Sequence, residues 1–402
     1  MRPMARDVVI VGGGLTGPLS ALALAQAGLS SLVLDAAPRP ERGPFDGRAY
    51  AVALGSVRML DALGVWDRVD DPEPIRAIRA SDGRPGEGAS ALHLRFDAAD
   101  IGEPWMGQMV EDRHLRHALL AACDAHDRVT LRFDAAVTGQ SVEGTRAVVT
   151  LEGDALSAPL LIGCDGRASG VAERAGLKRT TKEYGQTALT CAVRHARPHE
   201  GTAHQLFLPA GPLAILPLTD DRASLVWTED AATAAGMATL DDAAFLDVLR
   251  PRFGSFLGDI ALTGARGTYP LTRTYARDLV AERVALAGDA AHGIHPIAGQ
   301  GLNLGFKDVA ALAHVLSEAR RRGEDPGSAP VLARYARWRR FDAAQMGVAT
   351  DAVNALFSND DPLLRGLRRL GMGAVDRMDG LKRAFVREAA GVSGDLPALM
   401  RD

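Results

Sequence analysis

The chain has 402 residues, of which 47% are hydrophobic and 24% charged, and its 46 basic residues nearly balance 50 acidic ones. This length and apolar content allow one large core or two joined ones, and the near-neutral charge excludes a basic nucleic-acid-binding footprint over the whole chain. Three cysteines without a Cys-x-x-Cys pair argue against a disulfide framework and favour a reducing compartment. No apolar segment is long enough to span a bilayer, and glycines interrupt the apolar run after Asp7 too early for a signal sequence. We therefore expect a cytoplasmic protein that binds no nucleic acid.

The N-terminus carries a glycine motif between a strand and a helix. An apolar run at 8–11 predicts a buried strand, the segment 12–17 supplies G-x-G-x-x-G, and an apolar helix follows. In this context the glycines allow a tight turn, close approach of the backbone to a pyrophosphate, and tight packing of the helix on the strand. A second strand at 32–34 ends in an aspartate, at the position of an acidic residue that holds the ribose hydroxyls of an adenosine. The motif predicts nucleotide binding by Gly12, Gly14, Leu15, Thr16, Gly17 and Asp35.

A second strand-and-turn element lies in the middle of the chain. The run 160–163 predicts a strand, Asp165 and Gly166 form the turn after it, and a short helix is expected to end near Gly176. Such a turn would lie beside the glycine motif, because the carboxyl ends of parallel strands share one edge of a sheet.

The most informative stretch begins at Gly288. The apolar run 284–287 predicts a buried parallel strand, which delivers Asp289 to the sheet edge where ligands bind in open α/β folds. A short carboxylate there suits the hydroxyls of a ribityl chain. The Pro-x-x-Gly-x-Gly loop that follows opens a helix whose free N–H groups can stabilise negative charge, such as that on the pyrimidine edge of a reduced flavin. The predicted cofactor-binding residues of this stretch are Gly288, Asp289, Pro296, Gly299, Gln300, Gly301, Leu302 and Asn303.

Together, these three elements resemble the single-component flavoprotein aromatic hydroxylases that share the para-hydroxybenzoate hydroxylase fold. The resemblance implies FAD as the cofactor, with the Asp-Gly turn near the pyrophosphate and the Gly-Asp turn near the ribityl chain. It is narrower for the UbiH, UbiF and VisC group of ubiquinone-biosynthesis hydroxylases, and it extends from Asp7 to about Arg383. The segments that carry this narrower resemblance are 47–51, 63–66, 110–113, 211–218, 224–227 and 288–307.

The resemblance implies a reaction class. In this class the reduced flavin takes up oxygen to form a C4a-hydroperoxide, while the protein supplies orientation, electrostatics and exclusion of water. The single G-x-G-x-x-G belongs to the flavin, so NAD(P)H or another reductant would visit transiently. We expect an FAD-dependent monooxygenase that uses O2 to hydroxylate the ring of a polyprenyl phenol or benzoquinol in ubiquinone biosynthesis. Two alternatives stay open: a hydroxylase of small soluble phenols, and a non-catalytic flavin-binding subunit of a ubiquinone-synthesis complex.

The expected fold is α/β, with a Rossmann-like FAD-binding domain interrupted by a mainly antiparallel substrate domain. We expect the FAD-binding domain at 1–75, 98–180 and 270–350, the substrate domain at 76–97 and 181–269, and a C-terminal helical region at 351–402. Runs at 189–193, 203–208, 213–216 and 223–228, separated by turn residues, predict an antiparallel sheet that covers the flavin. The segment 81–88 is expected to be a loop between two strands of the smaller insertion.

Two arginines have a structural alternative beside the functional interpretation. Arg48 is expected near the isoalloxazine or the pocket entrance, and the alternative is a solvated charge. Arg113 is expected by resemblance to contact the cofactor, and the alternative is an ion pair with Glu111 or Asp112. Neither alternative is excluded by the sequence.

The sequence does not identify a general base. The catalytic candidates are Arg48, Tyr50, His292 and Pro296. His292 and His295 have the spacing of a metal pair, but no clustered cysteines or carboxylates complete a site, so no metal is expected. The predicted substrate-pocket residues are Phe207, Leu216, Pro217 and Trp227.

The C-terminal region is basic, with apolar residues at helical spacing. Asp361 and Pro362 would start a helix whose apolar positions continue to Phe385 among several arginines and lysines. A basic amphipathic helix can rest on anionic lipid or dock a partner, such as another ubiquinone-biosynthesis protein, and the alternative is a helix packed on the core. We expect peripheral contact with the inner face of the membrane, because a polyprenylated substrate is insoluble in water.

Overall fold

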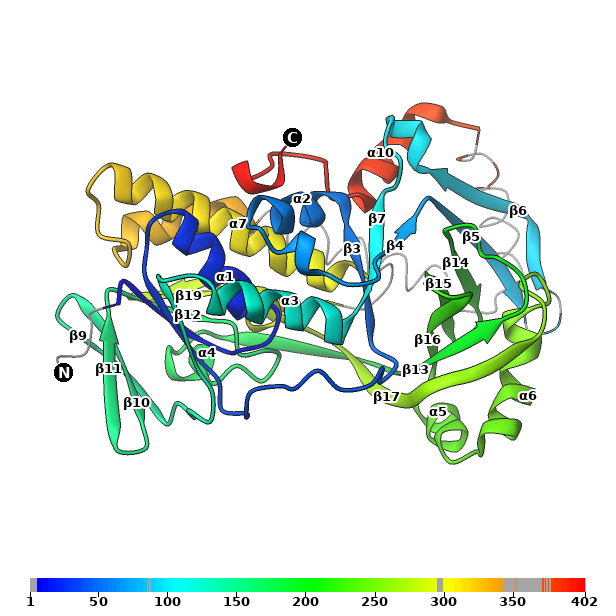
Figure 1. The fold of residues 1–402 in the computed structure, drawn as a ribbon, viewed down its shortest axis with the longest axis horizontal. Helices are drawn as coiled ribbons and strands as arrows, with labels where there is room; N and C mark the ends of the chain where they lie inside the picture. The colour runs from blue at the N-terminus through cyan, green and yellow to red at the C-terminus, as the bar shows by residue number, and fades with distance from the viewer. Residues whose placement is uncertain are drawn as a thin grey trace.

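Two large sheets of different kinds form the two halves of the molecule (Figure 1). The computed structural model describes residues 6–84, 86, 88–294, 299–340, 342, 351, 371, 373, 375 and 377–401. A mainly parallel six-stranded sheet lies in one half and an eight-stranded, largely antiparallel sheet in the other. This arrangement is the predicted α/β fold, in which a Rossmann-like part is joined to an antiparallel part.

The six-stranded sheet has the order β18-β19-β12-β1-β2-β8. Its central strand β1 is completely buried and pairs in parallel with β2 on one side and β12 on the other. Continuous apolar strands of this kind are typical of a parallel sheet that is covered on both faces. The strands are β1 (Val8–Val11), β2 (Ser31–Leu34), β8 (Val129–Arg132), β12 (Leu160–Gly163), β18 (Val280–Ala281) and β19 (Val284–Leu286).

Helices cover this sheet and pack against one another. The helix α1 (Thr16–Gln26) is apolar nearly all round and packs against α7 (Gln300–Arg321) and α3 (Asp112–Asp124). The short helix α4 (Gly170–Arg174) follows β12, and α2 (Leu54–Ala62) packs on α7. A three-stranded antiparallel sheet of β9 (Gly139–Glu143), β10 (Arg146–Leu151) and β11 (Asp154–Ala158) precedes β12.

The eight-stranded sheet has the order β20-β17-β13-β16-β15-β14-β5-β6. Its strands are β5 (Ala77–Arg84), β6 (Gly88–Asp97), β13 (Arg179–His195), β14 (Thr202–Leu208), β15 (Gly211–Leu218), β16 (Arg222–Asp230), β17 (Ile260–Ala276) and β20 (His292–Gly293). All four strand-like runs predicted between 189 and 228 are present and lie within longer strands. By contrast, β5 and β6 occupy most of 81–88, so the loop predicted there was too long.

One face of this sheet packs on α5 (Ala231–Ala238) and α6 (Asp242–Phe253), at the lower right of Figure 1. We call the apolar contact between them the outer cluster; its largest members include Leu189, Leu206, Leu213, Trp227, Phe245 and Phe253. The opposite face packs on the three-stranded sheet of β3 (Ala49–Ala53), β4 (Glu73–Ile75) and β7 (Gly107–Glu111). We call this second contact the inner cluster; it includes Leu54, Met109, Ala203, Leu218 and Val386.

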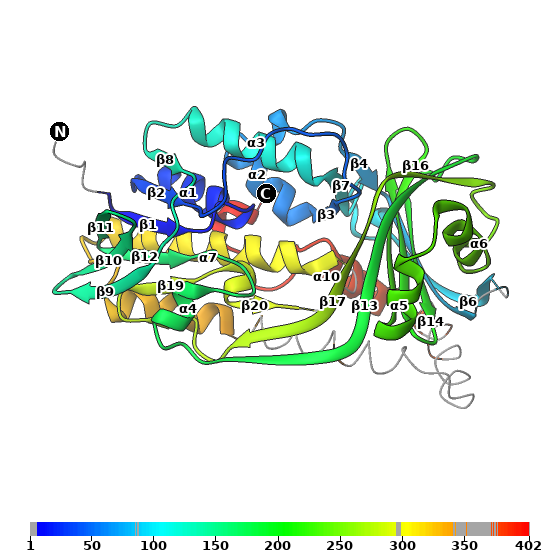
Figure 2. The ribbon, with the colours of Figure 1, turned by 90° about the horizontal axis from the view of Figure 1, so that it is seen from below.

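The strands β13 and β17 belong to both halves. They pair from Arg179 with Ala276 at one end to His195 with Ile260 at the other, with an irregularity between Glu183 and Thr187. Figure 2 shows the pair running from the parallel half into the antiparallel half. The predicted domain boundaries at 180/181 and 269/270 therefore fall inside continuous strands rather than in linkers.

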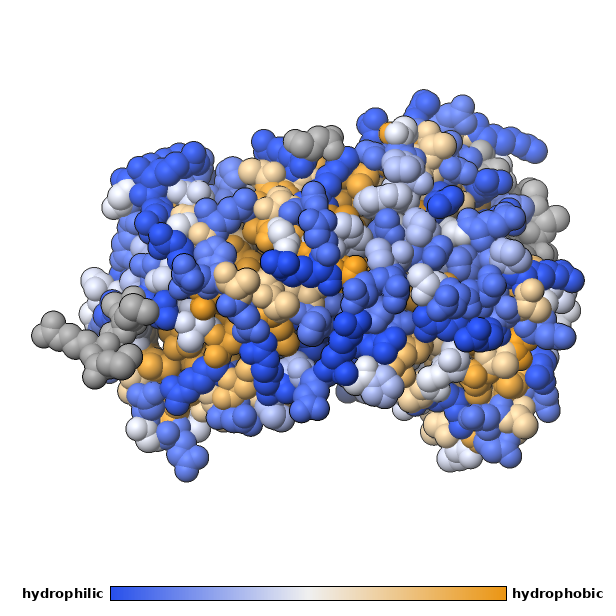
Figure 3. All heavy atoms as spheres, in the orientation of Figure 1, coloured by the Kyte–Doolittle hydropathy of each residue, from blue (hydrophilic) through white to orange (hydrophobic). Residues whose placement is uncertain are grey.

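The C-terminal region is described only in part. Most of the helix predicted from Asp361 lies outside the described residues, and the described portion contains α10 (Asp379–Ala389) and a short helix at Ala398–Met400. Within the described part of the chain, none of the helices combines the length and the hydropathy that a bilayer span requires. Figure 3 shows hydrophilic residues over most of the face seen in Figure 1, with hydrophobic residues gathered over α1, α2 and α3 and again over α5 and α6.

Candidate cofactor and substrate site

The glycine loop between β1 and α1 is closed on one side and open on the other. A Cβ on Gly12, which has a φ of +111°, would lie 2.3 Å from the Cys164 carbonyl oxygen, and a Cβ on Gly17 would lie 1.8 Å from the Gly12 carbonyl oxygen. A Cβ on Gly14 would meet no atom within 4 Å. Two glycines are thus required by packing within the protein, while the third leaves space above the loop.

Asp35 lies against this loop. Its carboxylate accepts the Gly13 N–H and, at 2.7 Å, the Ala37 N–H. The sequence placed Asp35 at the end of β2 as the partner of an adenosine ribose, and the structure brings it to the edge of the glycine loop.

The Asp-Gly turn lies directly beside the glycine loop, because β12 pairs with β1 and the Cys164 N–H donates to the Val11 carbonyl at 2.7 Å. Asp165 caps the start of α4 by accepting the Val171 N–H at 3.0 Å through Oδ2. Its Oδ1 is buried and has no hydrogen-bond partner within the described part of the chain. A Cβ on Gly166 would also meet open space.

The third turn joins the other two because β19 pairs with β12. Gly288 has a φ of +66°, and a Cβ there would lie 2.9 Å from the Thr16 hydroxyl. The three turns therefore meet at one edge of the sheet, with an unpartnered carboxylate oxygen and open space over Gly14 and Gly166. These features fit FAD, whose pyrophosphate needs close backbone approach and whose hydroxyls need acceptors.

Arg167 connects this edge to the antiparallel half, and sequence reasoning missed it. Its Nε lies 3.1 Å from the Asp289 carboxylate, and its other two nitrogens donate to the carbonyls of Thr272 and Ile294, both at 3.2 Å. A Cβ on Gly293 would lie 2.9 Å from Arg167 Nε. The only signal in the sequence was the position of this arginine directly after the Asp-Gly turn.

The start of α7 lies next to this edge. Gly299 precedes the helix with a φ of +64°. Asn303 uses its whole amide within the protein: Oδ1 accepts from the Ala53 N–H and the Ser56 hydroxyl, and Nδ2 donates to the Ala51 and Gly299 carbonyls. Asn303 therefore anchors the helix start to β3 and α2. Gln300, Gly301 and Leu302 lie in the first turn, whereas His295 and Pro296 lie outside the described residues.

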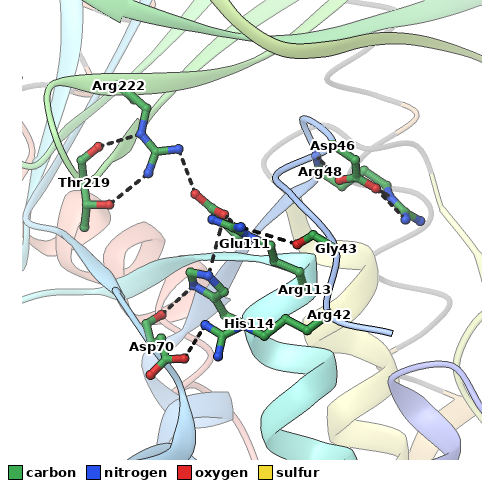
Figure 4. A network of polar contacts seen from close by, with 10 residues as sticks. All are labelled: Arg42, Gly43, Asp46, Arg48, Asp70, Glu111, Arg113, His114, Thr219 and Arg222. Atoms are coloured by element: carbon green, nitrogen blue, oxygen red, sulfur yellow. Dashed lines mark hydrogen bonds and ion pairs between the residues drawn. The ribbon is translucent and has the colours of Figure 1, made fainter. Parts of the chain in front are cut away.

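Arg113 belongs to a network that joins the two halves (Figure 4). The buried carboxylate of Glu111, at the end of β7, accepts from Arg113 Nε at 2.6 Å and from Arg222 Nη1 at 2.8 Å. Arg222 lies on β16 and also donates to Thr219. Of the two interpretations of Arg113, the ion pair with Glu111 is present, and its contact with the cofactor stays a proposal.

Arg48 and Tyr50 approach the same buried carboxylate, Asp112. The Arg48 side chain is 60% exposed and pairs with Asp46 at 2.6 Å, with Asp112 3.7 Å away. The Tyr50 hydroxyl donates to Asp112 at 3.1 Å, and burial, reinforced by Asp112, raises the pKa of Tyr50 well above its ordinary value. A protonated phenol that donates to a carboxylate is poorly suited to act as a general base.

His292 does not face open space. It is 2% exposed, and its Nε2 lies 2.8 Å from the carboxylate of Asp308 on α7. We therefore do not assign His292 the role of a general base. No group of three or more His, Cys, Asp or Glu side chains among the described residues is arranged to hold a metal ion.

Comparison with known proteins identifies the family. Residues 5–347 match the family model described as "FAD binding domain". The chain is 44% identical to the ubiquinone hydroxylase UbiL of Rhodospirillum rubrum, over 98% of this chain and 92% of that protein. It is 38% identical to the 3-demethoxyubiquinol 3-hydroxylase of Escherichia coli, over 96% and 98% of the two chains. The chain belongs to the FAD-dependent ubiquinone-biosynthesis hydroxylases. This membership confirms the resemblance to the UbiH, UbiF and VisC group.

Solved structures agree on the fold. The p-nitrophenol 4-monooxygenase PnpA of Pseudomonas putida superposes with a TM-score of 0.81 at 21% identity, covering 97% of this chain and 98% of that one. The combination of a Rossmann-like FAD part and an antiparallel sheet is thus the fold of a flavoprotein monooxygenase. Family membership, shown by the sequence comparison, makes this chain an FAD-dependent monooxygenase.

The predicted pocket residues of the hydroxylase lie on two different faces of the antiparallel sheet. Trp227 belongs to the outer cluster, where its indole N–H donates to Glu229 at 3.0 Å and its ring packs near Phe245. Pro217 pairs with Ala223, another outer-cluster residue, so it faces the same way. Both are therefore left out of the pocket that we propose. Side chains alternate along a strand, and sequence alone did not tell which face would meet the cofactor.

Phe207 and Leu216 lie on the other face. Phe207 is buried, and its two neighbours along β14, Leu206 and Leu208, both belong to the outer cluster. Because successive side chains of a strand point to opposite faces, the Phe207 side chain points away from that cluster. Leu216 packs against the inner cluster, together with Ala49 and Ala51 of β3. This inner face packs near β3, which Asn303 joins to the start of α7.

Proposed function

We propose that this hydroxylase adds oxygen to the aromatic ring of a polyprenyl phenol or benzoquinol during ubiquinone biosynthesis. The observation that carries the proposal is the meeting of three cofactor turns, at 12–17, 165–166 and 288–289, at one sheet edge that Arg167 links to the antiparallel sheet. The printed names of the two relatives, a ubiquinone hydroxylase and a demethoxyubiquinol hydroxylase, support this substrate class.

Different residues would bind the cofactor and cover the aromatic ring. We propose that the backbone at 12–17 and 165–166 holds the pyrophosphate, Asp35 the ribose, and Asp289 the ribityl hydroxyls. FAD, when bound, supplies the activation of O2, with NAD(P)H as a visiting reductant. Phe207 and Leu216 would exclude water from the ring, and the exposed Arg48 would lie at the entrance.

The test is a complementation experiment in cells from which this gene alone is deleted, with quinone intermediates measured by mass spectrometry. We expect a polyprenyl phenol that lacks one ring oxygen to accumulate, the wild-type gene to restore ubiquinone, and Asp289→Asn to restore it poorly. Asp278→Asn is the matched control, because Asp278 forms an exposed ion pair with Arg340 outside this site.

Two results would replace the proposal. Normal quinone levels in the deletion strain, with flavin bound to the purified protein, would favour a hydroxylase of small soluble phenols. Loss of all late intermediates together, restored equally by a variant that cannot bind FAD, would favour a non-catalytic subunit of a ubiquinone-synthesis complex.

We further infer that α10 makes peripheral contact with the inner face of the membrane. Among the described residues, four large hydrophobic side chains are exposed, and Met378, Leu381 and Phe385 account for three of them, at 55%, 37% and 49% exposure. The spacing of these three places them on one face of the helix. The same helix carries three basic residues, Lys382, Arg383 and Arg387, which suits anionic lipid.

Flotation with anionic vesicles tests this contact on the full chain. We expect the wild type to float and the double variant Leu381→Gln/Phe385→Gln to stay mostly in the protein fraction. Phe256→Gln is the control, since Phe256 is 38% exposed but does not lie on α10. Equal flotation of all three proteins would contradict the inference.

A further inference from the structure

A buried ion pair and a buried histidine lie behind the Gly288–Asp289 turn. The Asp308 carboxylate, on α7, pairs through Oδ1 with Arg339 Nε at 2.7 Å and through Oδ2 with His292 Nε2 at 2.8 Å. The side chains of Asp308 and Arg339 have no exposed surface, and that of His292 has 1%. Buried charges are rare unless they are paired, so the arrangement calls for an explanation.

Asp308 also holds the turn itself. Its Oδ2 accepts the Gly288 N–H at 3.0 Å, so one carboxylate oxygen lies between the turn and His292. The helix comes very close to the turn at this point, because a Cβ on Gly305 would lie 3.1 Å from the Gly288 Cα. Gly288 has a φ of +66°, a conformation that glycine adopts about as readily as a negative φ, so the backbone alone does not select it. Asp308, on the helix α7, holds the turn in this one conformation.

The charges are arranged so that Asp308 stays ionised. Burial raises the pKa of Asp308, but His292 and Arg339 outweigh burial and hold the pKa below its usual range. Arg339 is balanced in turn by Asp342, at 2.6 Å from its Nη1, and Asp342 also pairs with Lys307 at 2.7 Å. Apolar side chains of similar size would often give equal or greater stability at such a place. The retention of charge here therefore favours a role in fixing geometry.

We propose that Asp308 is a positioning residue that presets the Gly288–Asp289 turn for FAD, with Arg339 as its counter-charge and His292 packed beside it. The turn is held before the cofactor arrives, so FAD binding does not have to order it. The proposal rests on the assignment of Asp289 to the cofactor made above. It also gives His292 a place beside Asp308 in place of a role in proton transfer.

The first experiment compares three variants of the full chain: Asp308→Asn, Asp342→Asn and Asp289→Asn. We expect Asp308→Asn to weaken FAD binding about 10- to 100-fold, as expected for a lost hydrogen bond to a charged group. The visible circular dichroism of the FAD that still binds should change, because the turn is displaced. Asp342→Asn should change FAD affinity less than threefold, because Asp342 touches Arg339 but not Gly288.

The outcomes separate the two proposals. If Asp289→Asn weakens FAD binding and Asp308→Asn lowers only the melting temperature, with unchanged FAD affinity and dichroism, the positioning role is overturned and the site assignment stands. If Asp289→Asn leaves FAD affinity unchanged, the site assignment itself fails.

A second experiment needs no variant and covers the case in which Asp308→Asn does not fold. Hydrogen exchange of the Gly288 amide is measured in the wild-type protein with and without FAD. We expect strong protection in both states, because the N–H donates to a buried carboxylate. Fast exchange without FAD and protection only with FAD would show that the cofactor orders the turn, which overturns the proposal.

Discussion

Two glycines of the same loop should respond in opposite ways to replacement by alanine. A Cβ on Gly17 would lie 1.8 Å from the Gly12 carbonyl oxygen, whereas a Cβ on Gly14 would meet no atom within 4 Å. Gly14 is also absent from the glycines with positive φ, so alanine fits its backbone. Gly17→Ala must therefore push α1 away from β1, while Gly14→Ala changes only the open side of the loop.

The magnitudes follow from this geometry. Gly14→Ala should leave the apo-protein as stable as wild type or more stable by about 0.4–1 kcal/mol, through lower entropy of the unfolded chain. Gly17→Ala should destabilise the apo-protein by about 1–3 kcal/mol or more, as overpacked sites do. In Gly14→Ala the new methyl group would occupy the space above the loop. The free energy of FAD binding should therefore weaken by about 1.5–3 kcal/mol, the value of one hydrogen bond to a charged group, which raises the Kd roughly 10- to 150-fold.

Urea unfolding of the two apo-proteins and fluorescence titration with FAD measure both effects. The expected pattern is a normal apo-protein with weak FAD binding for Gly14→Ala, and a destabilised apo-protein for Gly17→Ala. Wild-type FAD affinity in Gly14→Ala would refute the reasoning, since the open side of the loop would then not be the pyrophosphate site.

Three further variants test other contacts. Tyr50→Phe should keep the hydroxylation rate and its pH profile, because the Tyr50 hydroxyl is a protonated donor to Asp112, and should lose about 1 kcal/mol of stability. Loss of one limb of the pH profile would show instead that this hydroxyl transfers a proton. Glu111→Gln should lower the free energy of unfolding by about 2–3 kcal/mol, because the buried Glu111 carboxylate bridges Arg113 and Arg222. A loss no larger than that caused by the exposed variant Asp46→Asn would contradict this role of the bridge. Burial, together with Arg79 and His93, lowers the pKa of His204 in the folded protein to about 4. The unfolded chain therefore binds this proton more tightly than the folded protein does, and the free energy of unfolding falls as the pH drops from about 6.5 to about 4. His204→Gln should remove up to about 3 kcal/mol of this pH dependence, and an unchanged slope would contradict burial as its cause.

The cofactor edge could be predicted from the sequence because its signals are local. The strands at 8–11, 160–163 and 284–286 are short apolar runs followed within two residues by glycine or aspartate, and all three are present. Parallel pairing then brings their ends together without further information. Family membership could be predicted from the other short segments that carry the narrower resemblance, which are spread from 47–51 to 288–307.

The long strands β13 and β17 could not be delimited in this way. The first part of β13, near residues 180–185, is polar and largely exposed, so it lacks the alternation that identifies a strand. Its partner strand lies far along the chain: Arg179 pairs with Ala276, 97 residues further on, and only that pairing makes the segment a strand. The predicted domain boundaries at 180/181 and 269/270 lie within this pair for the same reason.

The buried charges show where a sequence signal existed but remained incomplete. Leu304, Asp308 and Leu312 follow one another at intervals of four residues, so Asp308 had to lie on the buried face of α7. A carboxylate on such a face needs a partner of opposite charge or several donors, because its desolvation is otherwise too costly. The sequence therefore predicts that Asp308 has partners but does not identify them, because Arg339 and His292 come close to Asp308 only in the tertiary fold. A charged residue on the apolar face of a helix that follows a cofactor turn therefore indicates a contact that fixes the turn. Here Asp308 is that residue, and it accepts the Gly288 N–H.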